Sequence, residues 1–491
     1  MKINIIWLKK DLRLQDNECF NAASKDGLPV IIIYCFEKSL WKCDDASFRH
    51  FLFIKQSLED LATECCKFNF DLNIFSGEIL DVFTQIKSSY IINKIYSHQE
   101  TGNYASFKRD VEVKKWCHLQ NIDWVELVQN GVVRALQDRD GWSLRWYKKM
   151  SAKILEVPKS LSTLKISSNK IPDPYLLDLK HDGIISGQIG GRKNGLKILD
   201  EFLYQRGEGY SKEMSSPVSA FESCSRISPY LTYGCISIKE VFQKASARQN
   251  EIKNLPKGQK GKWPSALRSF LGRLRWHCHF IQKLEDEPEM EFKNLHPAYD
   301  AIDRGLNEKY YEAWKSGNTG FPMVDSCMRA LIECGWINFR MRAMLVSFAS
   351  NHLWLDWKIT SKHLARLFID YEPGIHYSQM QMQSGTTGIN AIRIYSPTKQ
   401  VVDQDPEGIF IRKYIPELKD ISNKNIATPS KEPLLMNGYP FPIVDEAVQR
   451  KLASQKLYAL RKNPEHKLDS KKILKKHGSR KSGLQRTTKN F

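Results

Sequence analysis

The first 130 or so residues alternate short apolar runs with stretches whose apolar side chains recur at helical spacing. The apolar runs lie at residues 3–8, 30–36, 72–75, 91–96 and 122–127. Between the second and third runs, Phe48, Phe51, Leu58 and Leu61 follow the period of a helix. Strands separated by helices are typical of a doubly wound α/β fold, with helices on both faces of a parallel sheet. We therefore predict an α/β domain over residues 1–134.

The loops of this region lack two well-known nucleotide-binding sequences. Residues 9–14 follow the first strand and contain no glycine, although a dinucleotide-binding turn needs G-x-G-x-x-G there. The glycine-rich segment 187–195 also fails as a P-loop, because Leu196 follows Gly195 where lysine is required. The sheet domain therefore gives no indication of NAD binding.

The chain changes character after the predicted sheet domain. Residues 135–195 are weakly patterned, and we interpret them as an interdomain linker. Residues 196–460 carry a helical pattern rich in Trp and Arg, which predicts a second, all-α domain. Residues 461–491 hold many Lys and Arg with little apolar content, so we predict a disordered basic tail. A chain of 491 residues is long enough for two or three cores.

The charge balance favours a polyanionic partner. Lys and Arg number 74 against 55 Asp and Glu, a formal charge of +19. Such an excess attracts nucleic acid, because neutralised phosphates release counterions. The alternative is a generic basic surface, exaggerated by the basic C-terminal segment. We expect DNA as the partner.

The cysteines and apolar runs indicate the compartment. Eleven cysteines are scattered without a C-x-x-C pair, which is typical of reduced thiols in a cytoplasm-like compartment. No cysteine follows Cys334, so a C-terminal iron–sulfur or zinc site would lack thiolates. His277 and His279 lie two apart on a predicted helix and point to different faces, so we expect no metal there. The chain enters a strand pattern at once and has no run of membrane-span length, so we expect no signal peptide and no membrane span.

Residues 223–231 contain a predicted helix start. Serine at Ser228 followed by Pro229 suits an N-cap and first helical position. Free backbone N–H groups there, with the hydroxyls of Ser225 and Ser228, suit a diphosphate. The alternative is a purely structural cap.

Residues 335–345 form an apolar helical run that contains two arginines. Arg340 and Arg342 are two residues apart, or about 200° around a helix, so both cannot easily face water. A buried arginine needs an anionic partner, and Asp370 and Glu372 are candidates. The alternative is an amphipathic helix with ordinary surface arginines.

Together these segments resemble the photolyase/cryptochrome family. The resemblance extends in order over nearly the whole chain to about residue 460, through residues 7–17, 225–231, 232–237, 319–325, 335–336, 414–418 and 439–444. It implies a Rossmann-like antenna domain and a helical domain that holds FAD in a U shape. The repair enzymes of the family excite reduced flavin with blue light and inject an electron into damaged DNA, whereas its cryptochromes use the same photochemistry for signalling.

The family motifs also imply the residues of a flavin site. Arg342 and Asp370 are expected to form an ion pair beside the isoalloxazine, and Glu372 stands where the family usually has a second Asp. His376 falls near the residue that faces flavin N5, where a protonatable imidazole could exchange a proton, although a histidine satisfied in the core is an alternative. Further FAD contacts are expected from Tyr210, Cys224, Ser225, Ile227, Ser228 and Trp336.

Several lesion-pocket positions depart from the family pattern. Arg273 reverses the charge of a glutamate that hydrogen-bonds the pyrimidine dimer, whereas Trp276 matches the tryptophan that packs on the lesion. An arginine can still donate to a carbonyl or phosphate. Further changes of residue type occur at His277, Phe339, Ala343, Met380 and Met382.

The electron relay that the family often uses is altered as well. Methionine replaces the flavin-proximal tryptophan at Met380, Trp357 takes the middle position, and the outer one aligns near Arg304. Methionine is much harder to oxidise than tryptophan, so this path should be broken or rerouted. If Trp357 belongs to a relay, Trp357→Phe should slow flavin photoreduction. Alternative relay residues, each also explicable as packing, are Trp336, Trp354, Tyr371 and Tyr377.

We therefore predict a monomeric, light-dependent DNA repair flavoenzyme, a photolyase. The alternative is a blue-light receptor of cryptochrome type, which the changed lesion pocket and the C-terminal segment favour. A third, weaker hypothesis is a protein that binds FAD and DNA without repair. Residues 98–103 lack the usual folate-binding Asn-Glu pair, so a second, antenna chromophore stays unidentified.

Overall fold

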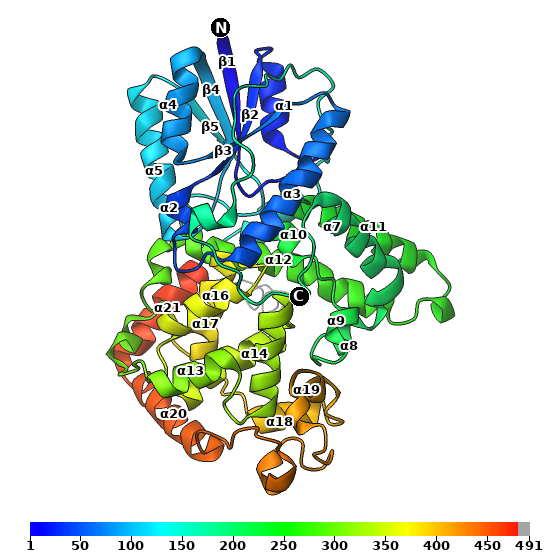
Figure 1. Ribbon diagram of the computed structural model, residues 1–491, viewed down its shortest axis with the longest axis vertical. Coiled ribbons are helices and arrows are strands. Elements are labelled where there is room, and N and C mark those ends of the chain that lie inside the picture. Colours follow the sequence, from blue (N-terminus) through cyan, green and yellow to red (C-terminus); the bar gives the residue numbers. More distant parts are fainter. Residues whose placement is uncertain (480–491) are drawn as a thin grey trace, which may run out of the picture.

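The structure, a computed structural model, describes residues 1–479. Its first part is a parallel sheet with strand order β3-β2-β1-β4-β5 (Figure 1). The strands are β1 (Lys2–Leu8), β2 (Val30–Phe36), β3 (Leu72–Ser76), β4 (Ile91–His98) and β5 (Asp123–Leu127). The predicted doubly wound α/β fold and its five strands are confirmed, with small shifts at the strand ends.

The two faces of the sheet are covered by different helices, as the alternation of side chains requires. On β1, Ile6 and Leu8 pack in the core that includes α1 and α3. Ile5 and Trp7 point the other way, into a core with α4 and α5. The helices are α1 (Glu18–Lys25), α2 (Lys38–Trp41), α3 (Phe48–Lys67), α4 (Ile79–Ser89) and α5 (Tyr104–Leu119).

The segment predicted as a linker packs on both domains. It contains α6 (Trp142–Met150) and a short 3-10 turn, η1 (Pro174–Leu177). Thr163 forms a parallel bridge with Val30, and Asn169 forms an antiparallel bridge with Ile74. Trp146 on α6 packs on Phe242 of the second domain, with ring centroids 5.3 Å apart, so residues 135–195 contact both domains.

The second domain is helical and lies below the sheet in Figure 1. Its helices are α7 (Arg192–Glu201), α8 (Tyr210–Glu213), α9 (Ala220–Ser223), α10 (Ser228–Thr232), α11 (Ile238–Asn254), α12 (Trp263–Asp286), α13 (Glu308–Ser316), α14 (Pro322–Cys334), α15 (Phe339–Ser347), α16 (Trp357–Leu367), α17 (Pro373–Ser384), α18 (Pro397–Gln404), α19 (Ile409–Tyr414), α20 (Glu446–Arg461) and α21 (Pro464–His477). Two π-helical turns, η2 (Phe202–Arg206) and η7 (Phe348–His352), interrupt them. Short 3-10 turns are η3 (Gly207–Gly209), η4 (Lys257–Gln259), η5 (Pro288–Glu291), η6 (Pro297–Ala301), η8 (Pro416–Leu418), η9 (Pro429–Lys431) and η10 (Pro433–Leu435).

A buried arginine of the sheet domain joins the two domains. Arg49 Nη1 on α3 donates to the carbonyls of Leu331 and Leu367, at 2.9 and 2.8 Å. Its Nη2 donates to the carbonyl of Ile332 at 3.0 Å. These carbonyls lie in the last turns of α14 and α16, where helices leave unpaired acceptors and partial negative charge. Arg49 therefore fixes α14 and α16 against the sheet domain.

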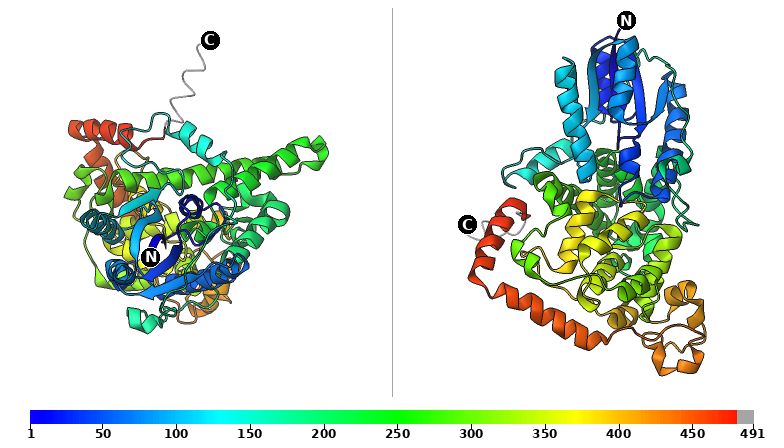
Figure 2. Two further views of the ribbon diagram at one scale, coloured as in Figure 1. Left: turned by 90° about the horizontal axis from the view of Figure 1, so that it is seen from above. Right: turned by 60° about the vertical axis from the view of Figure 1, so that its left-hand side comes forward.

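The predicted disordered tail is wrong for residues 464–477, which form α21 (Figure 2). His466 is buried and stacks on His296, with ring centroids 4.0 Å apart, and His477 is buried as well. Ser470 donates to the carbonyl of Gly388 at 3.1 Å. The helix buries histidines instead of an apolar stripe, so its contacts leave no hydrophobic signal in the sequence. Residues 480–491 lie outside the described part of the chain.

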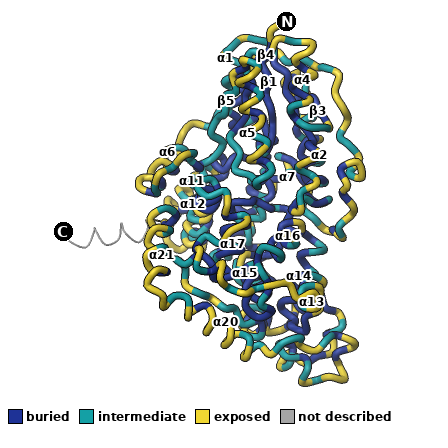
Figure 3. The backbone as a smooth tube through the Cα atoms, turned by 90° about the vertical axis from the view of Figure 1, so that its left-hand side faces the viewer, coloured by how far each residue is buried: buried dark blue, intermediate teal, exposed yellow. Residues whose placement is uncertain are grey.

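Buried residues concentrate in the sheet and the central helices of the second domain, whereas α20 and α21 are mostly exposed (Figure 3). Across residues 1–479, no helix combines the length and apolar character needed to cross a bilayer. All eleven cysteines are free thiols.

Candidate functional site

A pocket with about 940 Å³ of space lies between α10, α15 and α17. Most of the predicted cofactor residues line it, although they are far apart in sequence. The predicted residues in its wall are Tyr210, Cys224, Ser225, Ser228, Trp336, Arg342, Asp370, Glu372 and His376.

Four predicted residues do not line the pocket. Ile227 is buried in the core beside it. Trp276 is 38% exposed on α12, and the Arg273 guanidinium lies 5.8 Å from the ring of Phe339, a pocket residue that is itself 46% exposed. Arg273 therefore belongs to the rim. Trp357 is buried elsewhere, with Nε1 donating to Asn294 Oδ1 at 2.8 Å.

An ion pair crosses one wall of the pocket. Arg342 Nη1 and Nη2 donate to the two carboxylate oxygens of Asp370, each at 2.9 Å. The Nε of Arg342 donates to the carbonyl of Ile337 at 2.8 Å, and its guanidinium lies over the ring of Phe368. A two-pronged pair of this kind is stronger and better oriented than a single hydrogen bond. The ion pair therefore holds the Arg342 guanidinium and the Asp370 carboxylate in fixed positions at the pocket wall.

Ser228 does not serve as the predicted helix cap. Its hydroxyl donates to Asp370 Oδ2 at 2.6 Å, and α10 is only five residues long. The serine is drawn to the carboxylate because Asp370 has acceptor capacity left beside Arg342. The backbone of α10 therefore gives no support to the predicted diphosphate site at its start.

A cation that the motif contains, but that sequence reasoning passed over, lines the same pocket. Arg226 lies in the left-handed region with φ 57°, and its guanidinium is 4.2 Å from the ring of Trp336. Its Nε donates to the side-chain oxygen of Gln188 at 3.2 Å. Within residues 1–479, no carboxylate lies at ion-pair distance from Arg226. A largely buried cation without an acidic partner is a candidate anion ligand.

His376 is a neutral imidazole in this structure. Its Nε2 lies 3.0 Å from the Ser361 carbonyl, so Nε2 carries the proton and Nδ1 is an acceptor. Burial lowers the pKa of His376 to about 4. The predicted exchange of a proton with flavin N5 therefore has no support, because a ring with this pKa stays unprotonated near neutral pH.

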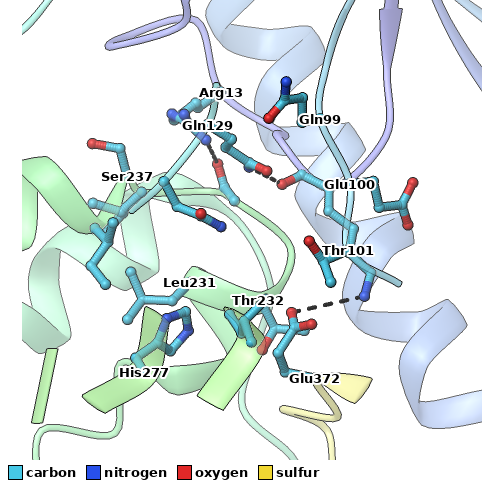
Figure 4. A pocket seen from close by; sticks show the side chains of 16 residues that line it. Arg13, Gln99, Glu100, Thr101, Gln129, Leu231, Thr232, Ser237, His277 and Glu372 are labelled. Carbon is cyan, nitrogen blue, oxygen red and sulfur yellow. Dashed lines mark hydrogen bonds and ion pairs between the residues drawn. The ribbon is translucent and has the colours of Figure 1, made fainter. Parts of the chain in front are cut away.

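Glu372 lies between this pocket and a cleft of about 520 Å³ between the domains. Figure 4 shows its side chain entering the cleft opposite Arg13 and Glu100 of the sheet domain. Burial raises the pKa of Glu372 to about 6, although Lys10, whose Nζ lies 3.8 Å away, opposes the shift. The carboxylate form is therefore destabilised at neutral pH.

Glu372→Gln is expected to stabilise the protein above pH 6. The folded state holds the Glu372 proton more tightly than the unfolded chain, so this proton stabilises the fold at low pH, and that stability is lost as pH rises through 6. At pH 8 the free energy of unfolding should be about 2 kcal/mol higher in the variant, and the difference should vanish below the unfolded-state pKa. Denaturant unfolding of both proteins from pH 4 to 8 measures it, with exposed Glu312→Gln as control. A constant difference at every pH would contradict the assignment.

Two family models match this chain. One, described as the FAD binding domain of DNA photolyase, covers residues 270–459, and the other, DNA photolyase, covers residues 4–162. The chain belongs to the photolyase/cryptochrome family. Within the family it is 26% identical to a deoxyribodipyrimidine photo-lyase of Agrobacterium fabrum, across 93% of this chain and 98% of that protein.

Solved structures of the family share the fold. A cryptochrome of Synechocystis sp. PCC6803 superposes with a TM-score of 0.81 at 20% identity, covering 93% of this chain and 99% of that one. An archaeal photolyase from Sulfolobus tokodaii, with two FAD molecules, gives 0.76 at 26% identity, covering 94% and 100%. Relatives thus include both photolyases and cryptochromes.

The pocket fits the FAD that the matched domain implies. Arg226 suits a diphosphate, and aromatic side chains such as Trp336 and Phe368 suit the flat rings. The Arg342–Asp370 pair offers fixed polar groups for the edge of an isoalloxazine. In addition, Gln379 Nε2 is buried against this pocket and has no hydrogen-bond partner among residues 1–479, and an unpaired donor of this kind suits an acceptor on a ligand.

Proposed function

We propose that this protein is an FAD-dependent, blue-light-driven DNA repair enzyme, a photolyase-type lyase that acts on ultraviolet photoproducts. The observation that carries the proposal is that α15 separates the flavin pocket from a cation-rich groove. Arg342 enters the pocket from one side of this helix, and Arg340 enters the groove from the other. The proposed flavin pocket and the proposed DNA-binding groove therefore lie on opposite sides of the same helix.

The groove has the chemistry of a nucleic-acid surface. It measures about 1110 Å³ and is lined by four cations and two tyrosines, Arg340, Arg393, Lys399, Arg450, Tyr395 and Tyr458. Lys399 pairs with Asp403 at 3.1 Å. The three arginines have no carboxylate at ion-pair distance within residues 1–479, and Arg340 Nε is buried without a partner. Unpaired guanidinium groups beside aromatic rings suit phosphates and bases.

The rim of the flavin pocket also suits an unstacked base. Trp276 and Phe339 are partly exposed aromatics, and Arg273 lies over Phe339. An enzyme that acts on a base in a duplex turns that base out of the stack and holds it against aromatic side chains. Arg273 can donate to a carbonyl or phosphate of the lesion, where a carboxylate would accept instead.

Bound FAD would supply blue-light absorption and one-electron transfer. Arg342 would hold the isoalloxazine edge, and Arg226 and Ser225 would hold the diphosphate. Neutral His376 would present Nδ1 as an acceptor, without a proton to give. Trp276 and Arg273 would position the damaged bases at the pocket mouth, and this placement would exclude water from the path to the cofactor.

A second chromophore is proposed for another pocket, of about 860 Å³, at the carboxyl ends of β1, β2 and β4, which shares Tyr371 with the flavin pocket. Ligands of open parallel sheets bind at such edges, where the strand order reverses. Lys9 and Arg109 provide cations there, and Trp41 provides an aromatic surface. The relative with two FAD molecules makes a flavin or another flat aromatic compound the leading class.

A light-dependent repair assay tests the main proposal. Purified protein, loaded with FAD and reduced, is incubated with ultraviolet-damaged oligonucleotides in darkness and under blue light. Loss of cyclobutane dimers and of (6-4) products is measured separately. We expect loss of one lesion in light alone. If neither lesion is lost although the flavin is photoactive, the repair proposal fails and a cryptochrome-type receptor is favoured.

A further inference from the structure

The wall of the flavin pocket contains three side chains that can give up an electron readily. They are Tyr210, Trp336 and Tyr371. Met380 is buried nearby on α17, and Trp357 does not reach the wall. The residue that replaces the usual tryptophan relay should therefore be found among these three.

The surroundings of Trp336 and Tyr210 disfavour both as electron donors. The Arg226 guanidinium lies 4.2 Å from the ring centre of Trp336, and this positive charge opposes the cation that tryptophan becomes when it loses an electron. Among residues 1–479, no carboxylate or histidine lies at hydrogen-bond distance from the Tyr210 hydroxyl, and the neighbouring Arg273 cannot accept a proton. A phenol that loses an electron becomes strongly acidic, so it needs a proton acceptor within hydrogen-bond reach.

Tyr371 has such an acceptor. Its hydroxyl donates to Asp45 Oδ2 at 2.6 Å, and both side chains are buried. Asn103 Nδ2 holds the same carboxylate, at 3.1 Å from Oδ1 and 2.9 Å from Oδ2. Burial, with the charge of Asp45 added to it, raises the pKa of Tyr371, so the resting phenol keeps its proton. The hydrogen bond between Tyr371 and Asp45 therefore links the segment just before α17 to the loop before α3.

We propose that Tyr371 is the first electron donor to the photoexcited oxidised flavin, with Asp45 as its proton acceptor. Tyr371 loses one electron to the flavin, its O–H bond breaks, and a new O–H bond forms on Asp45 Oδ2. The products are a neutral tyrosyl radical and a neutral carboxylic acid, and the flavin has gained one electron. An external thiolate then gives one electron to the tyrosyl radical and becomes a thiyl radical, and Asp45 returns the proton to Tyr371. This step rests on the proposed flavin site.

Tyr377 extends the route away from the pocket. Its hydroxyl oxygen lies 3.2 Å from that of Tyr371, and the ring centroids are 6.5 Å apart. It is buried and does not line the flavin pocket. Tyr377 is therefore placed to give an electron to the Tyr371 radical, which would move the radical farther from the flavin.

The test is flavin photoreduction under blue light with a thiol, in variants whose FAD content has first been measured. Tyr371→Phe and Asp45→Asn should slow photoreduction at least about tenfold. Tyr371→Trp should restore it, because tryptophan can be oxidised without losing a proton. Transient absorption should show a tyrosyl radical in the wild type that forms more slowly in D₂O. Neither feature should survive in Tyr371→Trp.

The matched control is Tyr439→Phe, which removes another buried tyrosine hydroxyl from a buried carboxylate. Tyr439 donates to Asp325 at 2.5 Å outside the flavin pocket, so its loss should leave photoreduction unchanged. Trp357→Phe should also leave it unchanged. If the flavin of a fully loaded Tyr371→Phe variant is photoreduced at the wild-type rate, the inference about Tyr371 is overturned while the proposed function still stands. Wild-type protein that binds no FAD would overturn the proposed function as well.

Discussion

Arg342→Ala is expected to give a folded protein that has lost most of its affinity for FAD. Among residues 1–479, the substitution leaves Asp370 with the Ser228 hydroxyl as its remaining side-chain donor, so a buried carboxylate faces the cofactor without its cation. Losing the charged hydrogen bonds that Arg342 would make to the bound cofactor should cost about 3 kcal/mol of binding free energy, which corresponds to a roughly 100-fold higher Kd. The measurements are the flavin-to-protein absorbance ratio after purification and a fluorescence titration with FAD.

Arg329→Ala is the matched control for this variant. Arg329 pairs with both carboxylate oxygens of Glu417, at 2.8 and 3.1 Å, and its side chain is 21% exposed against 22% for Arg342. It lies on α14 away from the flavin pocket, so its loss should destabilise the protein without removing flavin. If both variants retain FAD equally well, the Arg342–Asp370 pair does not hold the cofactor.

Removing two arginines of the groove, Arg393→Ala with Arg450→Ala, is expected to weaken binding to DNA by about 10-fold or more at moderate salt. Each guanidinium lost from a phosphate contact should also lower the slope of log K against log salt by about 0.9. Arg340 is left in place, because it shares α15 with Arg342. Fluorescence anisotropy with undamaged and ultraviolet-damaged duplexes, at several salt concentrations, measures both quantities.

The control for this experiment removes the same charge from another surface. Lys87 and Lys114 are exposed on α4 and α5 of the sheet domain, and their double alanine variant should bind DNA like the wild type. Equal losses in both double variants would show that net charge alone attracts DNA. In that case the groove would have no specific part in binding.

Local patterns in the sequence were sufficient for the sheet but not for the contacts between distant segments. The five strands follow from apolar runs, because a strand buried on both faces is apolar throughout. Helix α21 gave no such signal, since His466 and His477 make its buried contacts. A hydrophobic pattern cannot reveal a helix that docks through polar side chains.

The candidate site shows the same limit at the level of single residues. A charge within an apolar run requires a partner, which left Asp370 and Glu372 as candidates for Arg342, and the family resemblance implied Asp370. Ser228 was predicted as a cap, but the nearby carboxylate competes for its hydroxyl. The hydrogen bond between Asp45 and Tyr371 joins residues 326 positions apart, and no local pattern indicates it.

The hydrogen bonds of Arg49 bear on how this protein can be divided. A fragment without the sheet domain would leave the terminal carbonyls of Leu331, Ile332 and Leu367 without the guanidinium that neutralises them. In the isolated sheet domain, Arg49 would in turn lose the three carbonyl acceptors that its guanidinium contacts in the second domain. The two halves are therefore poor candidates for separate expression, and chimaeras with relatives require both sides of this junction to be transplanted together.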